Sequence, residues 1–234
     1  MTECQTGRML AGSGILIGPP PNQLFDIVVE FLKTHLPLLP ASLLNTNIDN
    51  ENGLNSLISR FITNAADQEM FFAERECMED ETRGDSAATD IGIYLKVEDC
   101  GIDPPMITAF ESKRLTMGLP KLRRREYVIG HVKDGKYVQC GGIERFKKSI
   151  HGDKFTHAGM FGYVQDGTAE HWLDQVNAWI VELSSHEHDP AWTDQEQLTQ
   201  MSTGGLVTES SSVVYRKTGK LYLTHLWINL VPQH

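Results

Sequence analysis

Cysteine is scarce in this sequence of 234 residues, and its arrangement narrows the classes of protein that fit. Cys4, Cys77, Cys100 and Cys140 are widely separated, and no two of them form a C-x-x-C pair. This spacing predicts neither a disulfide framework nor a cysteine-rich zinc cage. A reducing cytosol is therefore the simplest compartment for the chain.

Long apolar runs and a leader segment are missing as well. No run approaches the length needed to cross a bilayer, and residues 1–5 lack the basic and apolar stretches of a signal peptide. We therefore expect a cytoplasmic protein without membrane contact. A hydrophobic content of 40% and a charged content of 22% are ordinary for a globular domain. We expect an N-terminal arm over residues 1–21 and a single domain over residues 22–234.

The net charge of −10 is unfavourable for binding nucleic acid, but the charge is unevenly distributed. Residues 113–154 hold 12 basic and 4 acidic side chains, a balance of +8, whereas the rest of the chain holds 9 basic and 27 acidic ones, a balance of −18. Such a basic stretch suits phosphate groups, although it also suits a solvated loop and helix face. The residues expected to contact nucleic acid are Arg123, Arg124, Arg125, Arg145, Lys147 and Lys148. Arg145 also suits an ion pair with an acid on the surface.

Apolar periodicity predicts alternating helices and strands. Helical spacing occurs over residues 22–36, 50–62, 141–150 and 168–183, and strand patterns over 70–73, 90–97, 106–115, 160–164, 210–216 and 221–231. Asn22 is the expected cap of the first helix, which should end before Pro37. Residues 184–205 read as a polar loop, and residues 127–132 as a further strand or link. The predicted fold class is α/β, bordering on α+β, with a mixed β-sheet flanked by helices and a C-terminal β-hairpin.

An acid on one expected strand and a Glu-x-Lys on the next are the candidate catalytic residues. Asp90 opens the strand Asp90-Ile91-Gly92-Ile93, and Glu111-Ser112-Lys113 ends an apolar run. Residues two apart in a strand share a face, so Glu111 and Lys113 can face one pocket while Ser112 faces away. Carboxylates are hard ligands for Mg²⁺, and an ammonium beside them can hold an attacking water. A Glu-x-Lys alone is common, so the upstream acid and the basic stretch carry the prediction.

The order of these segments resembles the PD-(D/E)xK, or restriction-endonuclease-like, nuclease superfamily. The matching segments are Glu51-Asn52-Gly53-Leu54-Asn55, Asp90-Ile91-Gly92-Ile93, Phe110-Glu111-Ser112-Lys113 and Gly142-Ile143-Glu144-Arg145-Phe146. The resemblance covers residues 50–180 and implies a restriction-endonuclease-like sheet with a catalytic core over about residues 50–183. Thr89 stands where the family name has proline, a frequent departure that leaves the metal ligands in place.

This resemblance implies a Mg²⁺-dependent endonuclease that hydrolyses phosphodiester bonds in DNA, with Mn²⁺ as an alternative ion. Asp90 and Glu111 would bind the metal, Lys113 would position the water, and Glu51 would hold a metal-bound water. Glu74 and Glu76 are alternatives to Glu51, although both also suit a solvated strand edge. Family analogy points to the nuclease component of a prokaryotic defence or repair system. Target choice would then come from a protein partner or from homo-oligomerisation.

A function of another class stays open, namely a catalytically silent nuclease-fold scaffold or inhibitor that acts through protein contacts. The acidic surface and the apolar segment 36–40 would suit such an interface. The intact acids and lysine argue against it, because a scaffold has no need of all three.

The remaining histidines and tryptophans are expected to be structural. His186-x-His188 lies in a polar loop without a second pair of ligands nearby, so zinc is not expected there. His225 is expected to be a core or edge histidine, and Trp172 and Trp179 form a helical core stripe.

Overall fold

The computed structural model describes residues 21–39, 48–78, 88–97, 104–202 and 205–231. The predicted arm lies outside these ranges except for Pro21, the first residue of helix α1. The helices are α1 (Pro21–His35), α3 (Glu51–Ala65), α4 (Gly142–Lys147) and α5 (Ala169–Ser184), with short 3-10 turns η1 (Leu36–Leu38), η2 (Lys121–Arg123) and η3 (Asp194–Glu196). The strands are β1 (Phe71–Met78), β2 (Ala88–Leu95), β3 (Met106–Leu115), β4 (His131–Lys133), β5 (Lys136–Val138), β6 (His157–Val164), β7 (Thr199–Ser202), β8 (Val207–Arg216) and β9 (Gly219–Asn229).

Seven strands form one mixed sheet in the order β1-β2-β3-β6-β9-β8-β7. The first three strands form an antiparallel meander. Strand β6 then runs parallel to both β3 and β9, and β8 and β9 form the predicted C-terminal hairpin. Within the part of the chain that the structure describes, strands β4 and β5 form a separate two-stranded ribbon. The predicted α/β class with a mixed, helix-flanked sheet is therefore confirmed.

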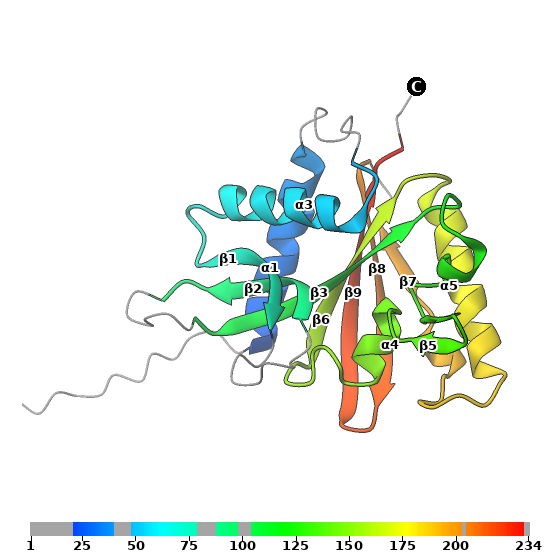
Figure 1. Ribbon diagram of the computed structural model, residues 1–234. Coiled ribbons are helices and arrows are strands. Elements are labelled where there is room, and N and C mark those ends of the chain that lie inside the picture. Colours follow the sequence, from blue (N-terminus) through cyan, green and yellow to red (C-terminus); the bar gives the residue numbers. More distant parts are fainter. Residues whose placement is uncertain (1–20, 40–47, 79–87, 98–103, 203–204, 232–234) are drawn as a thin grey trace, which may run out of the picture.

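Helices cover both faces of the sheet and bury two hydrophobic cores (Figure 1). On one face, α1 and α3 present residues at helical spacing, such as Leu32 and Ile58, to Phe110 and Phe161 of the sheet. On the other face, α4 and α5 contribute Phe146 and Trp172 among others. Strand β3 lies between β2 and β6 under both layers, so a polar side chain in its middle is buried.

The predicted first helix is present, although its start differs by one residue. Helix α1 begins at Pro21, before the expected Asn22 cap, and ends before Pro37 as predicted. Leu36 and Leu39 are buried in the first core, whereas Leu38 is 66% exposed. Pro37 is exposed as well, so half of the described part of segment 36–40 is interior and half is exposed.

The prediction of a polar loop over residues 184–205 is wrong for its second half. This part of the chain forms η3 and the edge strand β7. Trp192, Glu196 and Leu198 are buried there against the second core or its neighbours. The segment is polar on average because most of its side chains are exposed, so its composition did not indicate the few that are buried.

The helix predicted to run through Ile150 is shorter. Helix α4 ends at Lys147, and Ser149 has a φ of 54°, in the left-handed region where the helix cannot continue. Residues 127 and 128 belong to a turn, residues 129 and 130 have no regular structure, and β4 begins at His131. Within the described ranges, no helix combines the length and apolarity that crossing a membrane requires.

Candidate active site

Asp90 and Glu111 lie beside each other at one end of the pairing between β2 and β3. Ile91 pairs with Phe110, and each acid lies one residue beyond that pair. The Ser112 backbone N–H donates a hydrogen bond of 2.7 Å to Asp90 Oδ2, which turns this carboxylate toward β3. Glu111 is fully buried in the central strand, whereas the Asp90 side chain keeps 18% of its exposure.

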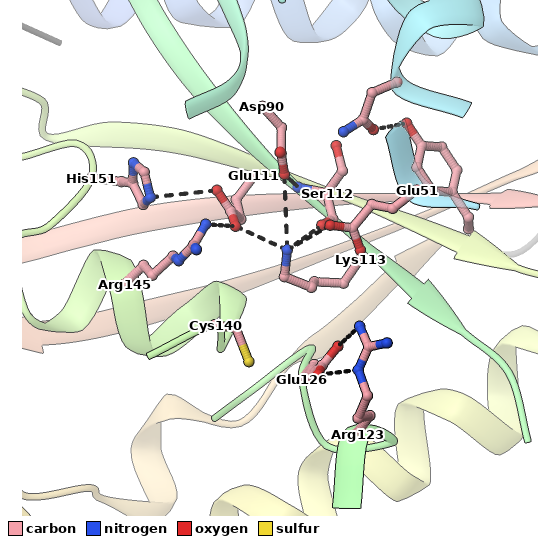
Figure 2. Close-up of polar contacts among 12 residues, drawn as sticks. Glu51, Asp90, Glu111, Ser112, Lys113, Arg123, Glu126, Cys140, Arg145 and His151 are labelled. Carbon is pink, nitrogen blue, oxygen red and sulfur yellow. Dashed lines mark hydrogen bonds and ion pairs between the residues drawn. The ribbon is translucent and has the colours of Figure 1, made fainter. Parts of the chain in front are cut away.

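Lys113 joins the acids into one cluster, as its two-residue spacing from Glu111 predicts (Figure 2). Its Nζ donates to Glu111 Oε1 at 3.0 Å, to Glu51 Oε1 at 3.0 Å and to the Ser112 carbonyl at 2.7 Å. Asp90 Oδ2 lies 3.9 Å from the same nitrogen. The ammonium therefore lies among oxygens from β2, β3 and α3.

Helix α3 brings Glu51 to the cluster because its first turn is held in place. Asn50 caps the helix by accepting a hydrogen bond from the Gly53 N–H at 2.9 Å. One turn after Glu51, on the same helix face, Asn55 accepts a buried 2.7 Å hydrogen bond from the Tyr163 hydroxyl of β6. Sequence reasoning missed Asn55 and Tyr163, although the four-residue spacing of two polar side chains was a usable signal.

The structure distinguishes among the acids that sequence reasoning left open. Glu51 contacts Lys113 directly. Glu74 is exposed on β1, and Glu76 is exposed and paired with Arg75. Of these acids, Glu51 is the one that lies at the cluster.

Arg145 and His151 also lie beside the Glu111 carboxylate. Arg145 Nη1 of α4 donates to Glu111 Oε1 at 2.7 Å, and His151 Nε2 lies 3.7 Å from Glu111 Oε2 (Figure 2). Sequence reasoning placed Arg145 against nucleic acid and did not single out His151. His151 follows α4 in a connecting segment, where no periodic pattern indicates what it faces.

The protonation states follow from burial and charge. Burial and, after it, the charge of the neighbouring Glu111 together raise the pKa of Asp90 to about 7. Burial also acts to raise the pKa of Glu111, but Lys113, His151 and Arg145 outweigh it and hold that pKa below its usual range. Burial acts to lower the pKa of Lys113, yet Glu111, Glu51 and Asp90 keep it above its usual range. At neutral pH, Glu111 is thus charged, Lys113 is an ammonium, and Asp90 titrates.

The donor atoms of this cluster fit a divalent cation. Glu111 Oε2 is buried and has no hydrogen-bond partner among the described residues. An orphaned charged oxygen in the interior costs more than the roughly 1–3 kcal/mol of a neutral group. A Mg²⁺ or Mn²⁺ ion held by Asp90 and Glu111 would give Glu111 Oε2 the partner it lacks, and carboxylate oxygens are the ligands that such ions prefer.

Much of the expected nucleic-acid surface is ion-paired within the protein. Arg123 binds both oxygens of Glu126, at 2.6 and 2.9 Å. Arg125 pairs with Glu182, Lys148 pairs with Glu144, and Arg124 donates to the Leu119 carbonyl. These side chains are less available to phosphate groups than their sequence suggests.

The prediction that Lys147 contacts nucleic acid is wrong. Its side chain is fully buried, and Nζ donates to Glu196 Oε1 at 2.6 Å and to the Tyr215 carbonyl at 3.1 Å. Lys147 lies four residues after Ile143 and therefore on the apolar face of α4. It joins α4 to η3 and β8.

The other histidines and tryptophans behave largely as expected. His225 is fully buried between the Tyr127 hydroxyl at 2.8 Å and the Ser212 hydroxyl at 2.9 Å, which confirms a core role. Trp172 is buried in the second core, with Trp179 partly buried against it. His186 and His188 line a surface groove.

A second cluster, which sequence reasoning missed, lies beside the first. Cys140 Sγ is 3.3 Å from His131 Nδ1, and the same nitrogen is 3.0 Å from Glu126 Oε1. Burial and, after it, the charge of Glu126 raise the pKa of Cys140 to about 11 against the opposing effect of Lys113. This set has a single cysteine and does not resemble a C-x-x-C motif. The spacing of the cysteines therefore gave no indication of it.

Comparison of the chain with protein-family models, with curated proteins and with solved structures finds no match. The function is therefore inferred from the chemistry of the site.

Proposed function

We propose that the protein is a metal-dependent nuclease of the PD-(D/E)xK type that hydrolyses phosphodiester bonds in DNA. The observation that carries the proposal is the buried cluster of Asp90, Glu111 and Lys113 from neighbouring strands, completed by Glu51. The order α3, β1, β2, β3, α4 and β6 supports it, because this is the order of segments in the superfamily that the sequence resembles.

Asp90 and Glu111 would hold Mg²⁺ or Mn²⁺. Such an ion lowers the pKa of a bound water and offsets the charge that develops on the phosphate. The Ser112 N–H fixes the orientation of Asp90, and Arg145 fixes that of Glu111. Both carboxylates are thus oriented before any ligand binds, which favours catalysis over a flexible arrangement.

Lys113 would orient the attacking water as a hydrogen-bond donor. Its raised pKa keeps the amine protonated at neutral pH, so in this state it does not accept the proton of that water. Glu51 is 28% exposed and contacts Lys113, which makes it the group best placed to accept a hydrogen bond from solvent at the site.

The DNA backbone would contact exposed cations near this site. Arg145 keeps 26% of its side-chain exposure beside Glu111, and Lys121, Lys133 and Lys136 are exposed on η2 and on the β4–β5 ribbon. Few free cations predict weak, salt-sensitive binding to DNA. We therefore propose that a protein partner or self-association supplies targeting, within a defence or repair system.

The scaffold alternative accounts less well for the buried charges. Replacing a buried ion cluster with apolar side chains is often neutral or stabilising, so a protein without catalysis has no evident need of this one. An interface function would also not require an orphaned oxygen on Glu111.

Metal-dependent cleavage of plasmid DNA tests the proposal. Wild-type protein should nick the plasmid in Mg²⁺ or Mn²⁺ but not in chelator. Lys113→Met and Glu111→Gln should lose roughly 100-fold or more in rate, since metal and water positioning contribute several kcal/mol. Glu51→Gln should also be slowed, whereas the matched acid variants Glu74→Gln and Glu76→Gln should cleave like wild type.

The outcomes against the proposal are equally concrete. Cleavage by Lys113→Met at the wild-type rate would show that the activity comes from elsewhere. Absence of cleavage of duplex DNA, single-stranded DNA and RNA in both metals, with candidate partners added, would favour the scaffold.

A further inference from the structure

The side chains of Glu126, His131 and Cys140 bring three metal-ligand atoms together within 4.8 Å. Among the described residues, this is the group of such side chains whose donor atoms converge in this way. They come from the turn after η2, the first residue of β4 and the segment before α4. We propose that these residues form a binding site for Zn²⁺, separate from the Asp90–Glu111 cluster and independent of the proposed nuclease activity.

The distances between the donor atoms suit tetrahedral coordination. With Zn–N, Zn–O and Zn–S bonds of about 2.0–2.3 Å, neighbouring ligand atoms lie roughly 3.3–3.6 Å apart. His131 Nδ1 lies 3.3 Å from Cys140 Sγ and 3.0 Å from Glu126 Oε1. These two distances are close to the required values, and the third pair of donor atoms, Cys140 Sγ and a Glu126 carboxylate oxygen, lies within 4.8 Å.

The same distances argue against a Cys–His nucleophilic pair. In such a pair, one ring nitrogen takes the proton of the thiol while the other is oriented by a third group. Here both the thiol and the carboxylate approach Nδ1 of His131. Three ligand atoms that lie this close together suit the coordination of a metal ion, not the transfer of a proton from thiol to imidazole.

The backbone around the cluster is tightly packed. A Cβ at Gly130 would lie 2.0 Å from the Val138 carbonyl oxygen, and a Cβ at Gly141 would lie 2.4 Å from Ile129 backbone atoms. Only glycine allows the segments before His131 and after Cys140 to approach so closely. The Gly142 N–H also donates to the Glu126 carbonyl at 2.8 Å, which ties the third ligand's segment to α4.

Arg123 acts as the supporting partner of this site. Its two hydrogen bonds orient the Glu126 carboxylate, and its charge balances that carboxylate when a thiolate is also present. The side chains of Glu126 and His131 are only 7% and 12% exposed. His131 also lines a surface groove of about 830 Å³, which gives an ion a route to the cluster.

The ion would connect the β4–β5 ribbon to the candidate active site. Gln139 precedes Cys140, and its carbonyl accepts a 3.2 Å hydrogen bond from Arg145 Nε. Arg145 in turn contacts Glu111. Figure 2 shows Cys140, Glu126 and Arg123 beside the Lys113 cluster.

Zinc content of the full chain, purified without chelator from zinc-supplemented cells, tests the proposal. Wild type should contain close to one equivalent. Cys140→Ser and His131→Ala should contain close to none, and Arg123→Ala should bind roughly 10-fold more weakly. There are two matched controls: Cys77→Ala, which removes a cysteine outside the proposed site, and Asp90→Asn, which changes the other cluster. Both should keep their zinc.

Cobalt substitution keeps the test informative if a ligand variant fails to fold. In a variant with Cys140 as its only cysteine (Cys4→Ser, Cys77→Ala, Cys100→Ser), Co²⁺ should give a thiolate-to-cobalt charge-transfer band and the visible bands of tetrahedral Co²⁺. Folding of each variant is checked by circular dichroism. Wild type that takes up neither Zn²⁺ nor Co²⁺, or folded Cys140→Ser that binds zinc like wild type, would overturn the proposal.

Discussion

Asp90 is a residue of the candidate site whose pKa is strongly shifted. Its carboxylate loses most of its hydration and faces the charged Glu111, so its pKa rises to about 7. The Asp90 carboxyl group ionises near neutral pH, but its burial makes the charged form costly in free energy. A bound cation would offset this cost. The same residue can be tested without knowing the substrate.

The Asp90→Asn variant should be more stable than wild type in chelator at pH 8. A carboxyl whose pKa is raised on folding stabilises the folded state below the unfolded pKa, near 4, and this contribution is lost as pH rises through about 7. Asparagine removes the penalty, for a gain of about 2–4 kcal/mol in the free energy of unfolding. Urea unfolding at pH 5 and pH 8 measures it, with exposed Asp174→Asn as the control.

Addition of Mg²⁺ should reverse that ranking. The ion stabilises wild type by binding its folded state, whereas Asp90→Asn loses the effect. Equal stabilisation of both proteins by Mg²⁺ would place the ion elsewhere.

His225 gives a pH prediction of the opposite sign. Burial lowers its pKa to about 3, so below pH 6.5 the unfolded chain takes up a proton that the folded protein does not. Unfolding free energy should therefore fall by about 2 kcal/mol between pH 8 and pH 5 on account of this residue. In His225→Gln the difference between the two pH values should shrink by that amount, while exposed His186→Gln should leave it unchanged. An unaltered pH dependence in His225→Gln would contradict a buried neutral histidine.

At the scale of elements, strand phase made the centre of the site predictable. Glu111 and Lys113 share a face because they are two apart, and Asp90 lies on the neighbouring strand that pairs with theirs. Glu51 is also recognisable, as an acid in the first turn of a capped helix. The contacts of these residues depend on the order of the strands in the sheet, where β6 lies beside β3. No local sequence pattern encodes that order.

Helix α4 shows where composition misleads. Its basic residues suggested one solvated face, but Ile143, Phe146 and Lys147 are at the spacing of a single buried face. Arg145 points instead to Glu111. Charge counted along the sequence does not show which cations are interior, whereas helical phase does.

Removal of the Lys147 ammonium should therefore affect stability rather than DNA binding. In Lys147→Ala the buried Glu196 loses its cation, which costs about 3–5 kcal/mol. Exposed Lys136→Ala should change the unfolding free energy by less than about 0.5 kcal/mol. Guanidinium chloride unfolding distinguishes the two. A Lys147→Ala protein as stable as wild type would contradict a tight pair between α4 and η3.

At the scale of the whole molecule, the two clusters offer different ligand atoms to a metal ion. The Asp90–Glu111 cluster offers carboxylate oxygens, which suit Mg²⁺ and Mn²⁺. The Glu126–His131–Cys140 cluster offers sulfur, nitrogen and oxygen, which suit Zn²⁺. Arg145 of α4 links the two clusters, because it contacts both Glu111 and the Gln139 carbonyl next to Cys140, and motif spacing alone does not predict this.

The most direct measurement is anomalous diffraction from crystals soaked in Mn²⁺. The proposed site predicts a peak between Asp90 and Glu111, with oxygen ligands at about 2.1 Å as for an ion of this kind. The Asp90→Asn crystals, soaked in the same way, should lack the peak. Full soaking of wild-type crystals with no manganese between these two carboxylates would contradict the account of a metal-dependent nuclease site.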